Sequence, residues 1–277
     1  MSDPPRPRRL RPRKRFGQHF LVDQGVVEQI FQALSLAQDD HVIEVGPGHG
    51  ALTARLLSEA ASVAAIEVDR DLAARLTTRF PALQLEVADV LRTDLAEFAH
   101  RTRGQARHTR IVGNLPYNIA TPLLGQLFGL ANSPSGTAPN RITDIHVMLQ
   151  REVADRLNAR LGSADYGRLT VMAQYHCQIE RLFDVHPTSF RPAPKVRSAF
   201  VRLRPRPNQP NCDLGALSQV LRTAFSKRRK TIANALAPLD LDLPALGLEP
   251  TLRPQELSVD DYVELARQLA PPGSTAR

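Results

Sequence analysis

The stretch HVIEVGPGHG, residues 41–50, decides the fold. A short apolar run ends in closely spaced glycines, and residues 51–60 then follow with the spacing of a helix. Further apolar runs alternate with helical patterns along the chain. Strands are expected at 63–68, 83–87, 110–112 and 145–149, and helices at 71–79 and 119–130. Strands that alternate with helices in this way predict βαβ units and a parallel sheet.

Two later segments extend this sheet. Residues 179–185 and 198–204 have strand patterns and are interpreted as antiparallel additions, which makes seven strands. The chain becomes rich in Pro and Arg at 202–211, and helical patterns follow. The predicted fold class is α/β, a doubly wound, mostly parallel seven-stranded Rossmann-like sheet with a small C-terminal all-α domain. The predicted parts are a flexible basic tail at 1–15, a sheet domain at 16–212 and a helical domain at 213–277.

Composition limits the partners and the compartment. The chain has 277 residues, enough for one α/β domain and a smaller companion. Its formal net charge of +8 favours a polyanionic partner, either nucleic acid or an anionic membrane surface. No run of about 18 apolar residues exists, so no membrane span is expected. Cys177 and Cys212 lack metal-ligand spacing and suit a reduced, cytoplasmic protein.

The glycines after the first strand mark a ligand site. Gly46, Gly48 and Gly50 let the backbone turn tightly and approach a ligand closely. Glu67 ends the second strand, where a carboxylate can accept hydrogen bonds from both hydroxyls of a ribose. Asp89 follows the third strand, where its carboxylate can accept from an adenine amino group. Three such features after three successive strands indicate a cofactor that contains a nucleoside.

The glycine spacing separates two classes of cofactor. Dinucleotide enzymes use Gly-x-Gly-x-x-Gly, which cradles a pyrophosphate at a helix N-terminus. Here the glycines are closer together, and Pro47 removes one backbone N–H from the loop. Such a loop suits the uncharged thioether–ribose part of S-adenosylmethionine (SAM) better than a pyrophosphate. SAM is therefore the predicted cofactor, with S-adenosylhomocysteine as its product.

The motif Asn114-Leu115-Pro116-Tyr117 follows the fourth strand, at the carboxyl edge of the sheet. The exocyclic amine of adenine is a poor nucleophile because its lone pair is delocalised into the ring. If the Asn114 side-chain oxygen and the Leu115 main-chain carbonyl accept its two hydrogens, the lone pair localises. Pro116 fixes the backbone direction, and Tyr117 can stack on the base, which contributes about 1–3 kcal/mol. The motif predicts methyl transfer to an amino nitrogen of a nucleic-acid base, driven mainly by alignment in a dry pocket.

Each motif also has a purely structural interpretation. The glycine run can be an ordinary tight turn, and Asp89 can be a helix cap. Asn114 can cap a helix that starts at Ile119, with Pro116 and Tyr117 as packing residues. The order of these motifs along one sheet favours the functional interpretation.

In its motifs the chain resembles the ribosomal RNA adenine N6-dimethyltransferases of the KsgA/RsmA type. Besides the residues above, the match includes KRFGQHFL at 14–21, LQREVA at 149–154, SFRPAPKV at 189–196 and AFSKRRKT at 224–231. The resemblance implies SAM contacts from His19, Leu21, Gly46, Glu67, Asp89 and Asn114. It implies that the target adenine stacks between Tyr117 and Phe190. It also implies the substrate, two adjacent adenosines near the 3′ end of small-subunit (16S) rRNA that each receive two methyl groups.

The chain departs from the family pattern at two positions. His19 stands where Asn is more usual, although a histidine can still donate through a ring nitrogen. Ala88 stands where Gly commonly precedes the acidic residue, here Asp89. In addition, the segments 100–109 and 131–141 look longer than typical loops. Phe190, beside two prolines, suits an aromatic lid on a flipped base, with a core anchor as the alternative.

Basic residues gather in four clusters, at 6–15, 101–110, 202–206 and 222–230. Within the last, Lys227, Arg228, Arg229 and Lys230 are consecutive, and on a helix they would spread around most of its circumference. This density favours phosphate contacts over a solvated face. These four residues and Lys195 are the predicted RNA-binding set. The first cluster is equally well a mobile tail, and the second equally well a solvated loop.

Two other functions stay open at this point. A large-subunit rRNA adenine methyltransferase of the macrolide-resistance type shares the SAM loop and an Asn-x-Pro-Tyr motif. A non-catalytic RNA-binding assembly or transcription factor on the same fold predicts an eroded glycine loop or an eroded 114–117 motif, and neither is eroded. The favoured prediction is a monomeric, cytoplasmic small-subunit enzyme that binds rRNA in a pre-30S particle through residues 213–277 and uses no metal.

Overall fold

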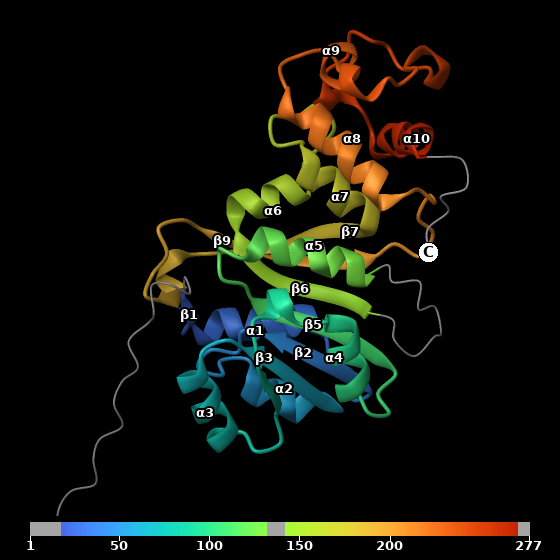
Figure 1. The fold of residues 1–277 in the computed structure, drawn as a ribbon. Helices are drawn as coiled ribbons and strands as arrows, with labels where there is room; N and C mark the ends of the chain where they lie inside the picture. The colour runs from blue at the N-terminus through green and yellow to red at the C-terminus, as the bar shows by residue number, and fades with distance from the viewer. Residues whose placement is uncertain (1–17, 132–141, 271–277) are drawn as a thin grey trace, which may run out of the picture. The chain divides into compact units, whose positions relative to one another are not determined.

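The computed structural model describes residues 18–131 and 142–270 of the chain (Figure 1). By their contacts the residues form two compact units. One contains residues up to 151 together with 182–202, and the other contains 152–181 together with those from 203 onward. The second unit thus includes residues that the prediction assigned to the sheet domain, because Tyr166 and Val171 share an apolar core with the C-terminal helices. The assignment of RNA binding to a part that starts at residue 213 stays a prediction. The predicted tail at 1–15 lies outside the described residues.

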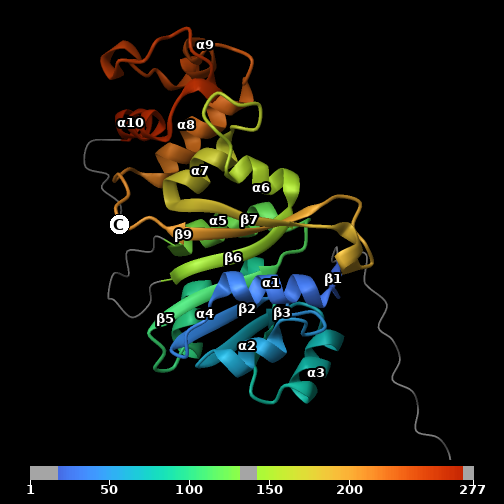
Figure 2. The same cartoon turned by 180° about the vertical axis from the view of Figure 1, so that it is seen from behind.

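The sheet has seven strands in the order β4-β3-β2-β5-β6-β9-β7 (Figure 1, Figure 2). They are β2 (Asp40–Val45), β3 (Ser62–Glu67), β4 (Gln84–Val87), β5 (His108–Asn114), β6 (Ile142–Gln150), β7 (Cys177–Val185) and β9 (Ser198–Pro205). Neighbouring strands from β4 to β6 pair in parallel. β2 is buried along its whole length, as expected of a central strand covered on both faces. The predicted fold class is confirmed.

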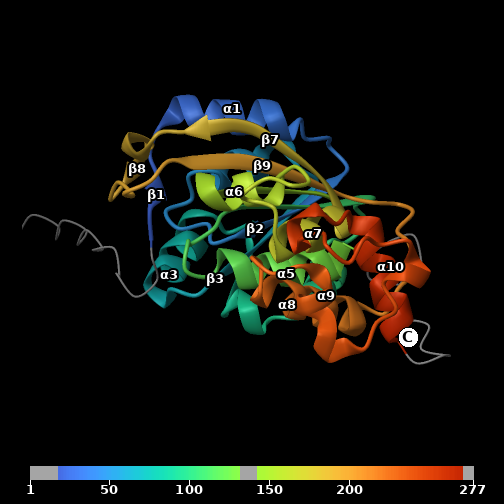
Figure 3. The same ribbon diagram turned by 90° about the horizontal axis from the view of Figure 1, so that it is seen from above.

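Helices cover both faces of this sheet. They are α1 (Gln24–Leu34), α2 (Thr53–Glu59), α3 (Arg70–Arg79), α4 (Leu95–Thr102) and α5 (Ala120–Ala131). α1 begins after Asp23, whose carboxylate accepts from the backbone N–H groups of Gly25 and Val26. Ile30 and Phe31 of α1 pack with α2 and with β2 in one buried cluster. Figure 3 shows α1 and α5 on opposite faces of the sheet.

The strand order reverses between β2 and β5. From β2 the chain proceeds to β3 and β4 on one side, whereas β5 and β6 lie on the other. In register, Val45 at the end of β2 lies opposite Ile66 on β3 and Gly113 on β5. The carboxyl ends of these three strands therefore meet at one edge, where doubly wound sheets form their ligand crevice.

A separate two-stranded sheet, which was not predicted from the sequence, joins distant segments of the first unit. β1 (Phe20–Leu21) pairs antiparallel with β8 (Phe190–Arg191), which follows a short 3-10 helix, η4 (Pro187–Ser189). The N–H of Val22 donates to the Ser189 carbonyl (2.9 Å), and the Ser189 hydroxyl donates to the Asp23 carboxylate (2.9 Å). The segment before α1 is thereby held against the segment that carries Phe190.

The second unit is mainly helical. Its helices are α6 (Arg151–Leu157, from its second residue), α7 (Arg168–His176), α8 (Leu214–Ser226), α9 (Ile232–Leu236) and α10 (Val259–Leu269), with 3-10 helices η5 (Ala237–Leu239), η6 (Pro244–Leu246) and η7 (Pro254–Glu256). Leu217, Val220 and Tyr262 are fully buried in its core. Among the described residues, no helix is long and apolar enough to cross a membrane.

The segment 100–109 corrects one expectation. It is not a loop throughout, because α4 continues to Thr102 and β5 begins at His108. Arg110, which was counted in the second basic cluster, lies inside β5 with only 7% of its surface exposed. Its guanidinium pairs with Asp144 (2.7 Å) and Asp40 (3.0 Å), since a charge is tolerated at such a position only when it is paired. The other long segment, 131–141, lies outside the described residues except for Ala131.

Candidate active site

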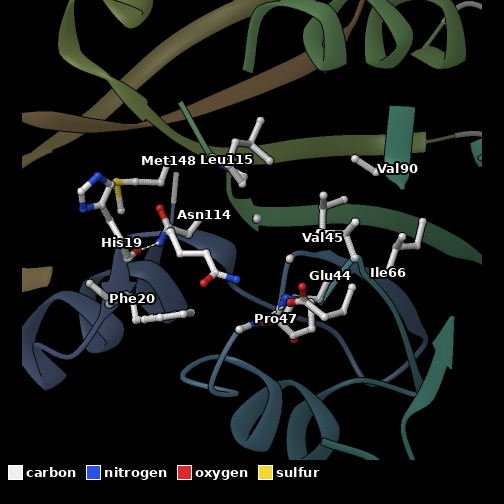
Figure 4. Close-up of a pocket in the computed structure, with 18 of the residues that line it drawn as sticks. His19, Phe20, Glu44, Val45, Pro47, Ile66, Val90, Asn114, Leu115 and Met148 are labelled. Atoms are coloured by element: carbon white, nitrogen blue, oxygen red, sulfur yellow. Dashed lines mark hydrogen bonds between the residues drawn. The ribbon is translucent and has the colours of Figure 1, made fainter. Parts of the chain in front are cut away.

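A cavity of about 280 Å³ opens at the point where the strand order reverses (Figure 4). This volume is close to the lower end, about 300 Å³, of typical small-molecule sites. The carboxyl ends of β2, β3 and β5, the turn after β4 and the segment around β1 form its walls. The predicted site residues that line it are His19, Leu21, Gly46, Gly48, Glu67, Asp89, Asn114, Leu115, Pro116 and Tyr117.

The loop after β2 has the backbone conformation that its glycines permit. Gly46 and Gly48 have φ values of 67° and 59°, in the left-handed region that side chains disfavour. A Cβ atom at Gly48 would lie 2.9 Å from the ring of Phe20, so that ring would have to move for any larger residue. The N–H of Gly46 donates to the Ile66 carbonyl (2.9 Å), which anchors the loop to β3. The loop backbone itself therefore forms one wall of the cavity.

Glu67 ties this loop to the end of β3. Its carboxylate is 4% exposed and accepts hydrogen bonds from the N–H groups of Gly48 (3.1 Å) and Asp69 (2.9 Å). Burial raises the pKa of Glu67 above its usual value. A carboxylate offers about four acceptor positions, so Glu67 can still accept from hydroxyl groups in the cavity.

Asp89 fits both of its interpretations. Its Oδ1 accepts from the N–H of Leu91 (3.0 Å) and caps the 3-10 helix η2 (Val90–Arg92). The same residue lines the cavity. Capping therefore fixes the carboxylate at the cavity wall. Its Oδ2 atom lies 3.9 Å from Nε of the exposed Arg92, which is longer than a hydrogen bond, so Oδ2 can still accept from a donor in the cavity.

Asn114 ends β5, and its side chain is fixed from outside the sheet. The Nδ2 atom donates to the main-chain carbonyl of His19 (2.7 Å; Figure 4). Because a carbonyl oxygen can only accept, this bond determines which end of the amide is nitrogen. The Oδ1 atom lies on the other side of the amide and is available as an acceptor. A residue that only caps the following helix would not make this contact, because His19 lies outside that helix.

The rest of the motif is held as firmly. The N–H of Leu115 donates to the Met148 carbonyl (3.2 Å), and Leu115 is 1% exposed. The Tyr117 hydroxyl lies 2.6 Å from the Ser198 hydroxyl, and its ring centroid lies 5.4 Å from that of His19. Burial raises the pKa of Tyr117, which keeps the phenol neutral.

Phe190 is the predicted catalytic residue that the structure does not bring to the cavity. It is fully buried in a cluster with Leu21, Val185 and Phe200. Phe190 lies directly opposite Leu21 in the β1–β8 pair, so both side chains face the same apolar core. In this conformation Phe190 is a core anchor, the alternative interpretation of its sequence position.

Several buried residues of the cavity wall were not predicted as site residues, among them Glu44, Met148 and Phe200. Glu44 on β2 is 2% exposed and accepts from the Thr53 hydroxyl (2.6 Å). Burial raises the pKa of Glu44 to about 7. Its signal was present in the sequence, because a carboxylate in a central strand is rarely buried unless it is paired.

The predicted RNA-binding residues lie elsewhere. Lys195 is exposed on the segment after β8. Lys227, Arg229 and Lys230 are exposed on a turn, because α8 ends at Ser226 with Lys227 as its cap residue. The four basic residues therefore do not spread around a helix. A cationic residue at this end of a helix is favoured by the helix dipole.

Arg228 differs from its neighbours in that turn. It is half-buried, and its Nη2 atom donates to the carbonyls of Ser163 (3.3 Å), Ala164 and Tyr166 (2.8 Å). Its guanidinium thus holds the segment that precedes α7. Within one run of four cations, three are exposed and one is committed to main-chain carbonyls.

Nearly the whole chain matches one known family. The family model described as "Ribosomal RNA adenine dimethylase" matches residues 9–266. The chain belongs to the ribosomal RNA adenine dimethylase family. The predicted family and the predicted class of enzyme are confirmed.

Similar proteins of known sequence and similar solved structures agree with this family. Ribosomal RNA small subunit methyltransferase A of Nitrosococcus oceani is 48% identical over 264 residues, covering 93% of this chain and 96% of that protein. The protein of the same name from Methylococcus capsulatus is 47% identical over 267 residues, covering 94% and 98%. A dimethyladenosine transferase from Plasmodium falciparum shares the fold, with a TM-score of 0.73, 24% identity and coverage of 89% and 96%. The 23S rRNA methyltransferase ErmE gives a TM-score of 0.63, 26% identity and coverage of 90% and 99%.

Proposed function

We propose that this dimethylase uses SAM to add two methyl groups to N6 of each of two adjacent adenosines near the 3′ end of 16S rRNA, as a step of small-subunit biogenesis. Relatives named ribosomal RNA small subunit methyltransferase A support the choice of the small subunit. The observation that carries the proposal is the fixed orientation of the Asn114 amide in a cavity lined by the glycine loop.

The residues of the cavity fit SAM as the cofactor. Glu67 retains acceptor positions for ribose hydroxyls, and Asp89 Oδ2, 3.9 Å from the exposed Arg92, retains lone pairs for an adenine amino group. The loop of Gly46 and Gly48 lines the cavity but offers it few N–H donors, because both of these N–H groups already donate to Ile66 and Glu67. Such a wall suits the uncharged thioether–ribose part of SAM. Bound SAM supplies a methyl group that its sulfonium charge has already activated. The proposed cofactor contacts are His19, Leu21, Gly46, Gly48, Glu67, Asp89 and Asn114.

The motif at 114–117 would prepare the target amine. Asn114 Oδ1 and the Leu115 carbonyl accept its two hydrogens, so that the nitrogen lone pair localises and faces the methyl donor. The bond from the Leu115 N–H to Met148 and the position of Pro116 keep that carbonyl in place. No strong base is needed, because the alkylated ammonium loses its proton readily to water.

Stacking would hold the base plane. Tyr117 is assigned this role, since its hydroxyl is held by Ser198 and its ring lines the cavity. Phe190 remains the predicted second stacking partner, a role that requires its side chain to leave the core. Buried apolar groups such as Leu115 and Met148 exclude water from the reacting atoms.

The proposed partner is rRNA within a pre-30S particle. Residues 213–277 would bind it, with the exposed cations of the turn after α8 and Lys195 on phosphates. We also propose that the enzyme is monomeric and cytoplasmic.

The test uses purified chain, tritiated SAM and two substrates, 30S and 50S subunits that lack dimethyladenosine. The proposal expects about four methyl groups per 30S subunit and background transfer to 50S. Asn208→Ala, a change at an exposed asparagine that does not line the cavity, serves as the control variant. Transfer to 50S alone would indicate the large-subunit activity suggested by the likeness to ErmE, and transfer to neither would support a non-catalytic RNA-binding role.

A further inference from the structure

His19 lies where three parts of the candidate site meet. It immediately precedes β1, which pairs with β8, so its neighbour Phe20 lies opposite Arg191 in register. The residue is half-buried and lines the cavity. Its position is thus fixed by a strand pair independent of the main sheet.

The main chain of His19 orients Asn114. Its carbonyl accepts the hydrogen bond from Asn114 Nδ2 at 2.7 Å. If this carbonyl moved, the amide would lose the partner that keeps Oδ1 free for the substrate. An error of about 1 Å in the position of a catalytic group can cost about 10²-fold in rate.

The ring of His19 makes two further contacts. Its Nδ1 atom lies 2.7 Å from the main-chain carbonyl of Pro192, so Nδ1 carries the proton and donates. The ring is tilted by 31° to that of Tyr117, at 5.4 Å between centroids. The bond to Pro192 joins the segment before β1 to the segment after Phe190 through a side chain, in addition to the strand pair.

We infer that His19 is a positioning residue for methyl transfer, a role separate from the contact with SAM proposed above. Its ring fixes the segment whose carbonyl orients Asn114, and it supports Tyr117 from one side. The inference rests on the proposed function, because Asn114 and Tyr117 are the groups assigned to the target base. It differs from the role that the family resemblance implies for this position, which is contact with SAM.

Three substitutions separate the ring's contributions. His19→Asn keeps a donor one bond from Cγ, as Nδ1 is, but has no aromatic ring to contact Tyr117. His19→Phe keeps a ring but has no donor for Pro192. His19→Ala removes both. Each variant retains the main-chain carbonyl, so the effect on Asn114 depends on how well the segment stays in place.

The experiment measures kcat and KM for 30S subunits at saturating SAM, together with the affinity for S-adenosylhomocysteine by calorimetry and thermal melting as a control for folding. We expect His19→Ala to lower kcat by about 10–10²-fold while the affinity changes less than about threefold. His19→Asn should recover most of the loss, and His19→Phe should recover less. If His19→Ala does not fold, the ranking of the Asn and Phe variants decides the question.

Two results would overturn the inference. Weakened S-adenosylhomocysteine binding with unchanged kcat at saturating SAM would make His19 a cofactor contact alone. Wild-type values in all three variants would leave it no role in positioning. Failure of the proposed function is distinguishable from both, because the wild-type chain itself would then transfer no methyl group to 30S subunits.

Discussion

The cavity at the sheet edge and the basic turn after α8 use polar residues in opposite ways. At the cavity, Asn114 and Glu67 are each fixed by hydrogen bonds to main-chain groups. In the turn, Lys227 and Arg229 are exposed, with long side chains free to adapt. Chemistry on an amine requires groups placed within a fraction of an ångström, whereas attraction to phosphates requires charge more than geometry. Substitutions should therefore act on rate in the first region and on salt-dependent affinity in the second.

The largest effect is expected for Asn114→Ala. This change removes the acceptor assigned to the target amine, and loss of one such oriented group costs about 10²–10³-fold in kcat. The affinity for 30S subunits should change little, because no phosphate contact is lost. Single-turnover methyl transfer and filter binding check the two quantities, with Asn208→Ala as the matched control. Equal losses of rate and of RNA affinity would remove the distinction between the two regions.

Arg110→Met should have the largest effect on stability. The change leaves Asp40 and Asp144 buried without their guanidinium partner, which costs about 3–5 kcal/mol in the free energy of unfolding. Arg107→Met, an exposed arginine three positions earlier, is the control and should change stability by less than about 0.5 kcal/mol. Urea unfolding measures both. Similar stabilities for the two variants would show that the buried pair is not needed.

Arg228 and Arg229 test the comparison within a single turn. Arg228→Ala should lower the free energy of unfolding by about 1–3 kcal/mol, because carbonyls of the segment before α7 lose their donor. Arg229→Ala should leave stability unchanged and weaken RNA binding, with a salt slope shallower by about 0.7. Melting curves and binding at several salt concentrations measure the two effects. The reverse pattern would contradict the assignment of Arg228 to the fold and Arg229 to the RNA.

Glu44 gives an expected effect on stability that depends on pH. The pKa of Glu44 is raised to about 7 in the folded chain, so folding favours its protonated form. Its stabilising contribution is present at low pH and is lost as the pH rises towards 7. Glu44→Gln keeps an acceptor for Thr53 and does not ionise, so its stability relative to wild type should rise between pH 5 and pH 8. Exposed Glu249→Gln is the control; a pH-independent difference for Glu44→Gln would contradict the raised pKa.

Much of the sheet and of the cavity was predictable because local patterns determine them. Buried parallel strands are short apolar runs, and the glycine loop, Glu67 and Asn114 all follow such runs. The contacts that fix these residues were not predictable, since they join segments far apart in the sequence. His19 lies 95 positions from Asn114 and 173 from Pro192, and no periodicity reports such a pair.

Charge runs were predicted less well than the sheet. A sequence records which residues are basic, but it does not show which of them find carboxylate or carbonyl partners after folding. Arg110 and Arg228 stand in basic clusters, yet one is paired inside the sheet and the other binds main-chain carbonyls. The burial of Phe190 was not predictable for a related reason, because its pairing with Leu21 depends on a strand pair of two residues each.

The most direct test of the central claim is mass spectrometry of 16S rRNA from cells that lack this protein. We expect two adjacent dimethyladenosines near the 3′ end to disappear. They should return when the wild-type chain is supplied and stay absent when Asn114→Ala is supplied. Dimethyladenosine at normal levels in the cells that lack the protein would contradict the account.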